Sequence, residues 1–479
     1  MAAKPPPPYA VIITALGFVA AAAVVQQARQ RKERKRQRRR QRKAKELALS
    51  QEGISSRGLR LNQPPLPYIG GLIAGFERPY DRATGEGVVL LAVAENKLAW
   101  RTLKPKVEAC LTDLPDWVAN YGPMEGQDAL RAPLAAFLSA RVVKTRVDAA
   151  HLSCATGVGA ALNNLFFAIC EAGDAVLIPA PYYSAFDSDL RAVCDLRRVP
   201  VRLDREKGYA LTRAALDAAY HAAGGKAKAL LLTNPHNPTG RPLSRRELEL
   251  AVEWCDRRRL HLVSDEIYAL SAVGDADGFL SLGELTGGDL GPRRHVLWGL
   301  SKDFGMSGLR FGVTWTKNEK LLSALATAAV FTCVPGPCQA MVAALLSDGA
   351  FVDAYLAENS RALAASRDAC AAVLDRLRLP YLRPRYGMFL WCDFSSLLPL
   401  IIGDGKRRAY SRDALFEAEA ALYDALLNEL RVVLTPGASQ HAPEPGFFRI
   451  CFAFVERDVL LVALAKFEAW VGRKRGEDE

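Results

Sequence analysis

One lysine segment holds the residue types that covalent chemistry on an aldehyde requires. Lys302 stands between Ser301 and Asp303, in a run with three glycines, and Arg310 follows eight positions later. A lysine attacks an aldehyde only after losing its proton, which a confined and partly desolvated pocket favours. The planar guanidinium of arginine donates two parallel hydrogen bonds to a phosphate. Together they suggest pyridoxal phosphate (PLP), although an ordinary glycine-rich surface turn is an alternative for this segment alone.

Small residues open a helical pattern at Cys154–Ala161, directly after a short apolar segment. Backbone N–H groups at a helix N-terminus bind phosphate, so the run is a candidate phosphate seat. A tight turn into a helix explains it equally well. The run also resembles the start of a dinucleotide-binding fingerprint, but Leu162 stands where the third glycine would be.

Three motifs could together grip a flat heterocyclic ring. The aromatic side chains of Pro181–Phe186 could stack on such a ring or belong to the core. In Asn234–Gly240, two Asn-Pro pairs fix an unusual turn and aim an amide side chain. Asp265 could keep a pyridine nitrogen protonated, which lets the ring draw off electrons, and Tyr268 could reach a phenolic oxygen on that ring. An exposed strand end is the alternative for these last two residues.

Arg449 lies inside an apolar, strand-like run near the end of the chain. A buried arginine is costly unless it is paired. The α-carboxylate of a substrate would supply a bidentate partner, whereas an internal salt bridge is the alternative.

Strand-like and helix-like patterns alternate from about residue 105 to 345, which is typical of a doubly wound α/β domain. Ligands of such sheets bind outside the carboxyl ends of the strands, where the polar motifs fall. A helix is predicted over Ser244–Arg259 and a longer one over Phe351–Arg378. The strand-like runs are Ala175–Pro179, Ala229–Thr233, Leu260–Ser264 and Val296–Gly299.

The sequence divides into four predicted parts. An N-terminal extension occupies residues 1–60, and residues 61–104 form an entry arm with part of a small domain. A large PLP-binding domain with a mostly parallel sheet follows at 105–345. A smaller C-terminal α/β domain completes the chain at 346–479.

The basic charge of the chain is confined to its N-terminal extension. The formal net charge is +11, and residues 1–50 alone hold 13 Lys/Arg against 2 Asp/Glu. The remainder is therefore neutral, which argues against a nucleic-acid partner. The ten cysteines form no CxxC pair and the six histidines show no metal-ligand spacing, so neither a disulfide framework nor a metal site is expected.

Residues 9–28 form an uncharged, largely apolar span, followed by a polybasic run over 29–45. Twenty helical residues reach about 30 Å, the thickness of a bilayer core. A basic run after an apolar span is typical of the cytoplasmic side of a membrane segment. We therefore expect membrane association through residues 9–45 with the body facing the cytosol. An organelle-targeting extension or a soluble cytoplasmic protein are the alternatives, and whether the extension is cleaved is not determined.

Taken in order, these motifs resemble the class I, fold-type I PLP enzymes, and within them the 1-aminocyclopropane-1-carboxylate (ACC) synthase-like branch. The resemblance covers about residues 65–470. Further similar blocks are Ala94–Leu98, Asn120–Gly122, Gly387–Asp393 and Thr435–Gly446. The resemblance implies the fold of that family, with a large doubly wound sheet domain and a smaller C-terminal α/β domain.

The resemblance also implies a role for each matching residue. Lys302 would hold PLP as a Schiff base and later shuttle the substrate Cα proton. Asp265 would pair with the pyridinium and Arg449 would bind the substrate carboxylate. The phenolic oxygen would be held by Asn237 and Tyr268, the ring would be stacked on Tyr183, and the phosphate would be seated by Ala155, Thr156, Ser301 and Arg310.

Two further residues carry expectations about assembly and substrate. Tyr121 would reach the phosphate or substrate from the neighbouring subunit, so the resemblance implies a homodimer. Glu95, if it points into the site, would be a counter-charge for the sulfonium of S-adenosylmethionine, although an interdomain ion pair is the alternative. One departure from the family is Gly299, which stands where a phosphate-binding serine is common.

We predict a PLP-dependent aminotransferase that transfers the amino group of an L-amino acid to a 2-oxo acid. ACC synthesis from S-adenosylmethionine is the alternative, and a membrane-tethered protein without catalysis is a remote one. Glu95 favours ACC synthesis. Lys97, where the branch has glutamine, and Thr239, where plant ACC synthases usually have leucine, favour transamination. The amino donor and acceptor cannot be named from these residues.

Overall fold

The computed structural model describes residues 53–61, 66, 68–403 and 410–476. Their contacts divide the chain into two compact units, Met1–Pro64 and Pro65–Glu479. The described part of the first unit contains the short helix α2 (Ser56–Leu61). All other elements in the described residues belong to the second unit.

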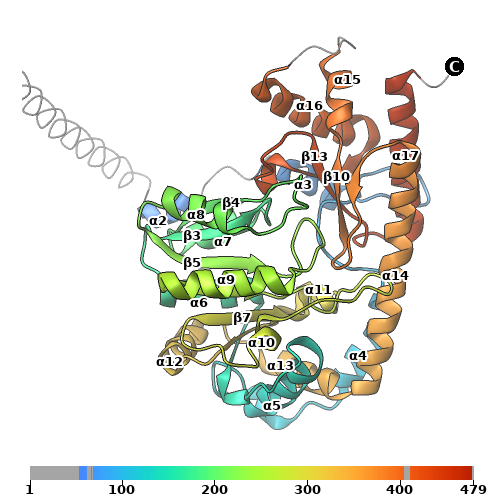
Figure 1. Ribbon diagram of the computed structural model, residues 1–479. Coiled ribbons are helices and arrows are strands. Elements are labelled where there is room, and N and C mark those ends of the chain that lie inside the picture. The colour runs from blue at the N-terminus through green and yellow to red at the C-terminus, as the bar shows by residue number, and fades with distance from the viewer. Residues whose placement is uncertain (1–52, 62–65, 67, 404–409, 477–479) are drawn as a thin grey trace, which may run out of the picture. The chain divides into compact units, whose positions relative to one another are not determined.

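A seven-stranded sheet forms the centre of the second unit (Figure 1). Its strand order is β2-β8-β7-β6-β5-β3-β4, and β8 alone runs antiparallel to its neighbours. This arrangement confirms the predicted α/β domain with a mostly parallel sheet. The strands are β2 (Leu152–Ala155), β3 (Ala175–Ala180), β4 (Arg197–Arg202), β5 (Ala227–Thr233), β6 (His261–Asp265), β7 (Arg294–Gly299) and β8 (Gly312–Thr316).

The two faces of the large sheet enter separate hydrophobic cores. In β5, Ala229 and Leu231 belong to one core, whereas Leu230 and Leu232 belong to the other. Successive side chains of a strand point to opposite faces, so apolar residues at every position bury both. This pattern explains why the strands read as continuous apolar runs, as expected of a parallel sheet covered by helices on each face.

Helices connect these strands and cover the sheet. Helix α9 begins where Ser244 and Glu247 form a reciprocal capping box, and it ends at Arg259 in the left-handed conformation. Helix α6 packs on β8, and α9 packs on β6. The helices of this region are α4 (Trp100–Thr112), α5 (Asp128–Phe137), α6 (Val158–Ile169), α7 (Phe186–Ala192), α8 (Arg213–Ala222), α9 (Arg245–Arg258), α10 (Leu282–Leu285), α11 (Leu300–Asp303), α12 (Glu319–Ala328) and α13 (Gly336–Ser347).

A smaller antiparallel sheet with its own helices forms the C-terminal part. Its strand order is β12 (Thr435–Pro436), β13 (Phe447–Cys451), β10 (Phe389–Asp393) and β9 (Tyr381–Leu382). Strand β1 (Val89–Leu90) pairs in parallel with β11 (Val432–Val433), which joins the entry arm to this part. The limits of the four predicted parts stay predictions. The helices here are α3 (Ile69–Glu77), α14 (Gly349–Arg376), α15 (Leu398–Ile402), α16 (Arg412–Leu430) and α17 (Arg457–Arg475), and α14 packs against α17 (Figure 1).

The predicted membrane segment, with its apolar span 9–28 and polybasic run 29–45, lies outside the described residues. Among the helices that are described, none is by itself both long and apolar enough to cross a bilayer. Helices α13 and α14 meet the length and composition criteria only as a pair bent by 85°.

Candidate active site

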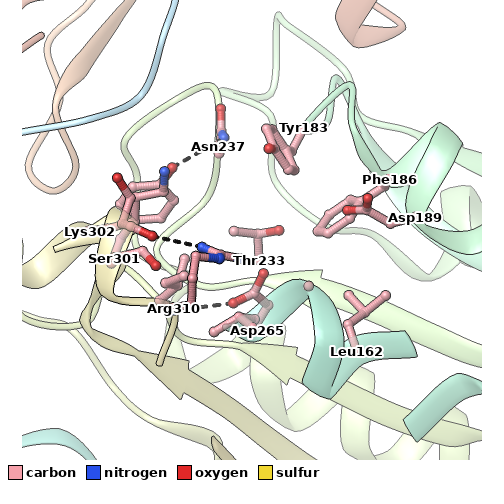
Figure 2. A pocket seen from close by; sticks show the side chains of 15 residues that line it. Leu162, Tyr183, Phe186, Asp189, Thr233, Asn237, Asp265, Ser301, Lys302 and Arg310 are labelled. Carbon is pink, nitrogen blue, oxygen red and sulfur yellow. Dashed lines mark hydrogen bonds between the residues drawn. The ribbon is translucent and has the colours of Figure 1, made fainter. Parts of the chain in front are cut away.

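A cavity of about 240 Å³ lies at the carboxyl ends of the large-sheet strands (Figure 2). Thr233 ends β5, Asp265 ends β6, and Lys302 follows β7 in α11. This is the edge at which ligands of doubly wound sheets bind. Seven of the predicted residues line the cavity, namely Tyr183, Asn237, Asp265, Tyr268, Ser301, Lys302 and Arg310.

Lys302 presents its amine to this cavity. Its Nζ donates to the Ala94 carbonyl oxygen at 2.6 Å, and its side chain is half-buried. Burial lowers the pKa of Lys302 below its ordinary value, and the charge of Arg449 lowers it further, whereas Glu95 and Asp265 act in the opposite direction. The neutral amine that an attack on an aldehyde requires is therefore more accessible than on an exposed lysine.

The turn that carries Lys302 is anchored by its neighbour Asp303. This fully buried carboxylate accepts hydrogen bonds from Ser271 Oγ at 2.6 Å and from Trp298 Nε1 at 2.9 Å. The Asp303 carbonyl oxygen accepts a third bond from Tyr355 Oη at 3.1 Å. Three elements thus fix the backbone beside Lys302, which the sequence segment by itself did not reveal.

Asp265 is positioned to pair with a cationic ring nitrogen. Its carboxylate is buried, and Oδ1 accepts a hydrogen bond from the Ile267 backbone N–H at 3.3 Å. Burial raises the pKa of Asp265 to about 7. A bound cation would favour the charged carboxylate, so this buried acid suits a pyridinium partner.

The two asparagines of the Asn-Pro motif have different structural roles. The Asn234 side chain forms two hydrogen bonds with the backbone, both at 2.9 Å, and shapes the turn. Its Nδ2 donates to the Leu280 carbonyl oxygen, and its Oδ1 accepts from the Leu243 N–H. Asn237 instead faces the cavity, where its Nδ2 donates to Tyr268 Oη at 3.5 Å. The structure therefore brings together the two residues predicted to hold a phenolic oxygen.

The phosphate end of the site is built from closely packed backbone. Gly157 has φ +93°, and a Cβ there would lie 2.4 Å from Arg310 Nη2, so only glycine fits. Val158 and Gly159, at the start of α6, line the cavity together with Arg310. Ala155 and Thr156 precede this stretch and do not line the cavity: Ala155 lies within β2, and the Thr156 N–H donates to the Thr332 carbonyl oxygen. The helix N-terminus is present, but these two residues are set back from it.

Gly299 is enclosed too tightly to have accepted the serine that the family commonly has. A Cβ would lie 2.6 Å from the Phe311 carbonyl oxygen and 2.8 Å from Val158 Cγ2. We expect Gly299→Ser to destabilise the protein by about 1–3 kcal/mol through overpacking and to leave PLP affinity no better. Thermal unfolding and PLP titration measure both.

The control for that prediction is Gly308→Ser, because nothing lies within 4 Å of a Cβ built there. This variant should unfold at the wild-type temperature. A Gly299→Ser protein with wild-type stability and tighter PLP binding would contradict the steric argument.

Arg449 lies in β13 and is buried, with 3% of its surface exposed. Its Nη1 donates to Asn237 Oδ1 at 3.0 Å, and its Nη2 donates to the Ala92 carbonyl oxygen at 2.5 Å and to Thr435 Oγ1 at 3.3 Å. Within the described chain these partners are neutral oxygens, not carboxylates. The guanidinium charge therefore remains available for an anionic group, beside Asn237, which is predicted to hold the phenolic oxygen of the ring.

Glu95 and Tyr121 lie outside the set of residues that line the cavity. Glu95 Oε1 accepts a hydrogen bond from Ser307 Oγ at 2.5 Å, and Ser307 does line it, so Glu95 stands one side chain behind the wall. Tyr121 is 97% exposed. A chain that used this tyrosine in its own site would bury it, so its predicted role requires a second subunit.

Two residues that favoured transamination do not line the cavity. Lys97 places its Nζ 3.7 Å from the centroid of the Phe454 ring. Thr239 is buried, and its Oγ1 lies 2.8 Å from His236 Nδ1. Neither side chain lines the cavity, so neither separates the two candidate reactions.

Eight residues that line the cavity were not among the predicted site residues, namely Val158, Gly159, Leu162, Phe186, Asp189, Thr233, Ile267 and Ser307. Phe186 ends the aromatic motif and begins α7, Asp189 lies further along α7, and Thr233 is the last residue of β5. The position of Thr233 was a usable signal, because the carboxyl ends of the strands face the ligand edge of the sheet.

The fold and the site together define a PLP enzyme: a lysine for the aldehyde, a buried acid for the ring nitrogen, and a glycine cradle with arginine for the phosphate. A sequence model of the family described as aminotransferase class I and II matches residues 86–467. The chain belongs to this family, whose members of this branch are PLP-dependent enzymes.

Similar proteins include ACC synthases of plants. The chain is 35% identical over 436 residues to 1-aminocyclopropane-1-carboxylate synthase 5 of Oryza sativa subsp. japonica, covering 85% of this chain and 79% of that protein. It is 31% identical over 422 residues to 1-aminocyclopropane-1-carboxylate synthase-like protein 1 of Arabidopsis thaliana, covering 85% and 83%. These relatives confirm the ACC synthase-like branch of the family.

Solved structures of similar fold include an aspartate aminotransferase from Thermus thermophilus with maleate. Its TM-score is 0.71 at 23% identity, covering 87% of this chain and 99% of that one. Aspartate aminotransferase from Thermotoga maritima has a TM-score of 0.69 at 20% identity, covering 88% and 100%. At these identities the likeness is one of fold.

Proposed function

We propose that this protein is an aminotransferase that moves the amino group of an L-amino acid to a 2-oxo acid. The supporting observation is that Lys302 and Asp265 line one cavity and that Arg449 donates a hydrogen bond to Asn237, which also lines it. Transamination needs a base, an acid partner for the ring nitrogen and a cation for the substrate carboxylate. These three residues supply those groups without any further pocket.

Each residue has a distinct task in the proposed reaction. Arg449 holds the α-carboxylate through two parallel hydrogen bonds, which orients the Cα–H bond. PLP, when bound, supplies an electron-poor ring that stabilises negative charge at Cα. Asp265 keeps the nitrogen of that ring protonated. Lys302 Nζ takes the Cα proton and returns it at a different carbon, because one base beside both carbons serves both transfers.

ACC synthesis is the second candidate, favoured by Glu95 and by the names of the plant relatives. In this reaction the Cα of S-adenosylmethionine would bond to Cγ of the same molecule, while the Cγ–S bond breaks and methylthioadenosine leaves. Glu95 raises the pKa of Lys302, so its charge acts inside the site although its side chain stands behind Ser307. A negative charge there would attract a sulfonium.

One pair of assays separates the candidates. The purified protein is incubated with a panel of amino acids plus 2-oxoglutarate or pyruvate, and separately with S-adenosylmethionine. Transamination predicts new keto acids without methylthioadenosine. Release of methylthioadenosine without amino-group exchange would overturn the proposed reaction and establish the second.

We also propose that two chains form each pair of sites, with Tyr121 acting on the partner. A dimer that combines one Tyr121→Ala chain with one Lys302→Ala chain should keep about half the wild-type turnover, because one of its two sites contains both native residues. Differently tagged chains, co-expressed and purified through both tags, provide this dimer. If Tyr121 acted within its own chain, neither site would be intact and turnover would be lost.

Membrane association through residues 9–45 remains a proposal that rests on composition. Carbonate extraction of the full-length protein, beside a variant that begins near Leu61, tests it. The full-length chain should stay with the membrane and the shortened chain should be released. Complete release of the full-length chain would contradict the anchor.

A further inference from the structure

Asp189 is a carboxylate in the cavity to which the proposed reaction gives no task. It lies on α7 and lines the same cavity as Asp265. Figure 2 shows it beside Phe186, across the cavity from Lys302 and Ser301. An acidic side chain in a cofactor cavity is costly unless it serves a charge there.

The bonding of Asp189 differs from that of its neighbour Asp187 on the same helix. Asp187 accepts hydrogen bonds from Tyr182 Oη at 2.9 Å and Arg198 Nε at 3.1 Å, and it contacts His441 Nε2 at 2.7 Å. Asp189 has no side-chain hydrogen bond or ion pair with any described residue. Asp187 is therefore tied into the structure, whereas Asp189 remains open toward the cavity.

The apolar surroundings of Asp189 strengthen the electrostatic interaction of its carboxylate with other charged groups in the cavity. Leu162 and Phe186 are apolar residues that line the same cavity, and burial raises the pKa of Asp189 to about 6. The charge of Asp189 in turn helps to raise the pKa of Asp265. Two carboxyl groups in a poorly hydrated cavity interact strongly. The other titratable or charged side chains that line it are Tyr183, Tyr268, Lys302 and Arg310.

We infer that Asp189 is a positioning residue for the ring nitrogen of PLP, acting through Asp265. Asp265 would face the pyridinium, and Asp189 places a second negative charge in the same cavity. The added charge makes loss of the ring proton less favourable, so the ring stays an electron acceptor over a wider range of pH. The inference rests on cofactor binding and not on which reaction follows.

The decisive test compares two ligands in Asp189→Asn. One is PLP, and the other is its analogue in which a C–H replaces the ring nitrogen. Dissociation constants are measured by quenching of tryptophan fluorescence, without substrate. Loss of one nearby charge should weaken PLP binding about three- to tenfold and leave binding of the analogue unchanged, because the analogue has no ring proton to hold.

A second readout is the pH titration of the visible absorption of the PLP-loaded protein. The pH midpoint of this titration should fall in Asp189→Asn, because the variant lacks a negative charge that favours the protonated form of the bound cofactor. Asp189→Glu should restore both the midpoint and the preference for PLP over the analogue.

The outcomes decide the inference in both directions. Equal weakening of the binding of both ligands would mean that Asp189 only supports the fold. Unchanged binding with an unchanged pH midpoint would mean that the charge of Asp189 does not affect the cofactor. Asp187→Asn is the control, and it should lower thermal stability without selecting between the ligands. If Asp189→Asn does not fold, binding of PLP and of the analogue is compared in Asp189→Glu. Loss of the preference for PLP over the analogue in that variant would contradict the inference. No result depends on the amino-acid substrate, so failure of the proposed function would appear separately.

Discussion

Lys302→Ala is expected to abolish turnover while the protein still folds. A positioned base contributes about 10²–10⁴ in rate, and this side chain also supplies the amine that reacts with the cofactor aldehyde, so we expect a loss of at least about 10³-fold. The fold should persist because the turn is held by Asp303, Ser271 and Trp298 and not by the lysine itself. Steady-state turnover and circular dichroism measure the two parts.

Lys97→Ala is the matched control for that experiment. The amine of Lys97 lies over the Phe454 ring, and Lys97 does not line the cavity. Its removal should leave turnover within about twofold, as for most surface contacts of this kind. A Lys302→Ala protein that kept a tenth of wild-type turnover would contradict the assigned role.

Arg449→Leu is expected to lower kcat/KM for the amino acid by about 10²–10⁴-fold. Two hydrogen bonds to a charged group contribute about 1.5–3 kcal/mol each, and about 1.4 kcal/mol corresponds to tenfold. KM should rise strongly, because Arg449 is proposed to hold the substrate and not the cofactor. Kinetics at saturating PLP, with PLP titration alongside, measure this difference.

Arg449→Lys separates charge from geometry. A lysine keeps the positive charge but cannot donate the parallel pair of hydrogen bonds, so kcat/KM should lie between the wild-type and leucine values. Equal losses of PLP affinity and of kcat/KM in both variants would show that Arg449 supports the cofactor cradle through Asn237 and does not bind substrate.

Much of the fold was predictable from apolar runs and from the residues that interrupt them. The strand expected over Ala229–Thr233 is β5, and the helix expected over Ser244–Arg259 is α9 with those two residues as its caps. The signals for such elements are local, because a strand buried on both faces and a helix with a capping box are each recognised from residues that are close together in the sequence. Strand β1 was not predictable, because its partner β11 lies far along the chain.

The reaction chosen by the enzyme depends on side-chain directions that spacing does not determine. Thr239 differs from plant ACC synthases, yet its hydroxyl pairs with His236 behind the cavity wall. Glu95 matches its motif, yet Ser307 stands between it and the cavity. Both residues looked informative in the sequence, and their bearing on specificity changed once their neighbours were known.

The sequence by itself determined the class of chemistry, because Lys302 and Asp265 are unusual residue types at strand ends and Arg449 is unusual inside an apolar strand. It could not reveal Asp189, since an acidic residue in a helix is ordinary until the surrounding walls are known. Only the tertiary structure decided which side chains share a cavity, as burial and the absence of a partner are properties of the packed neighbours.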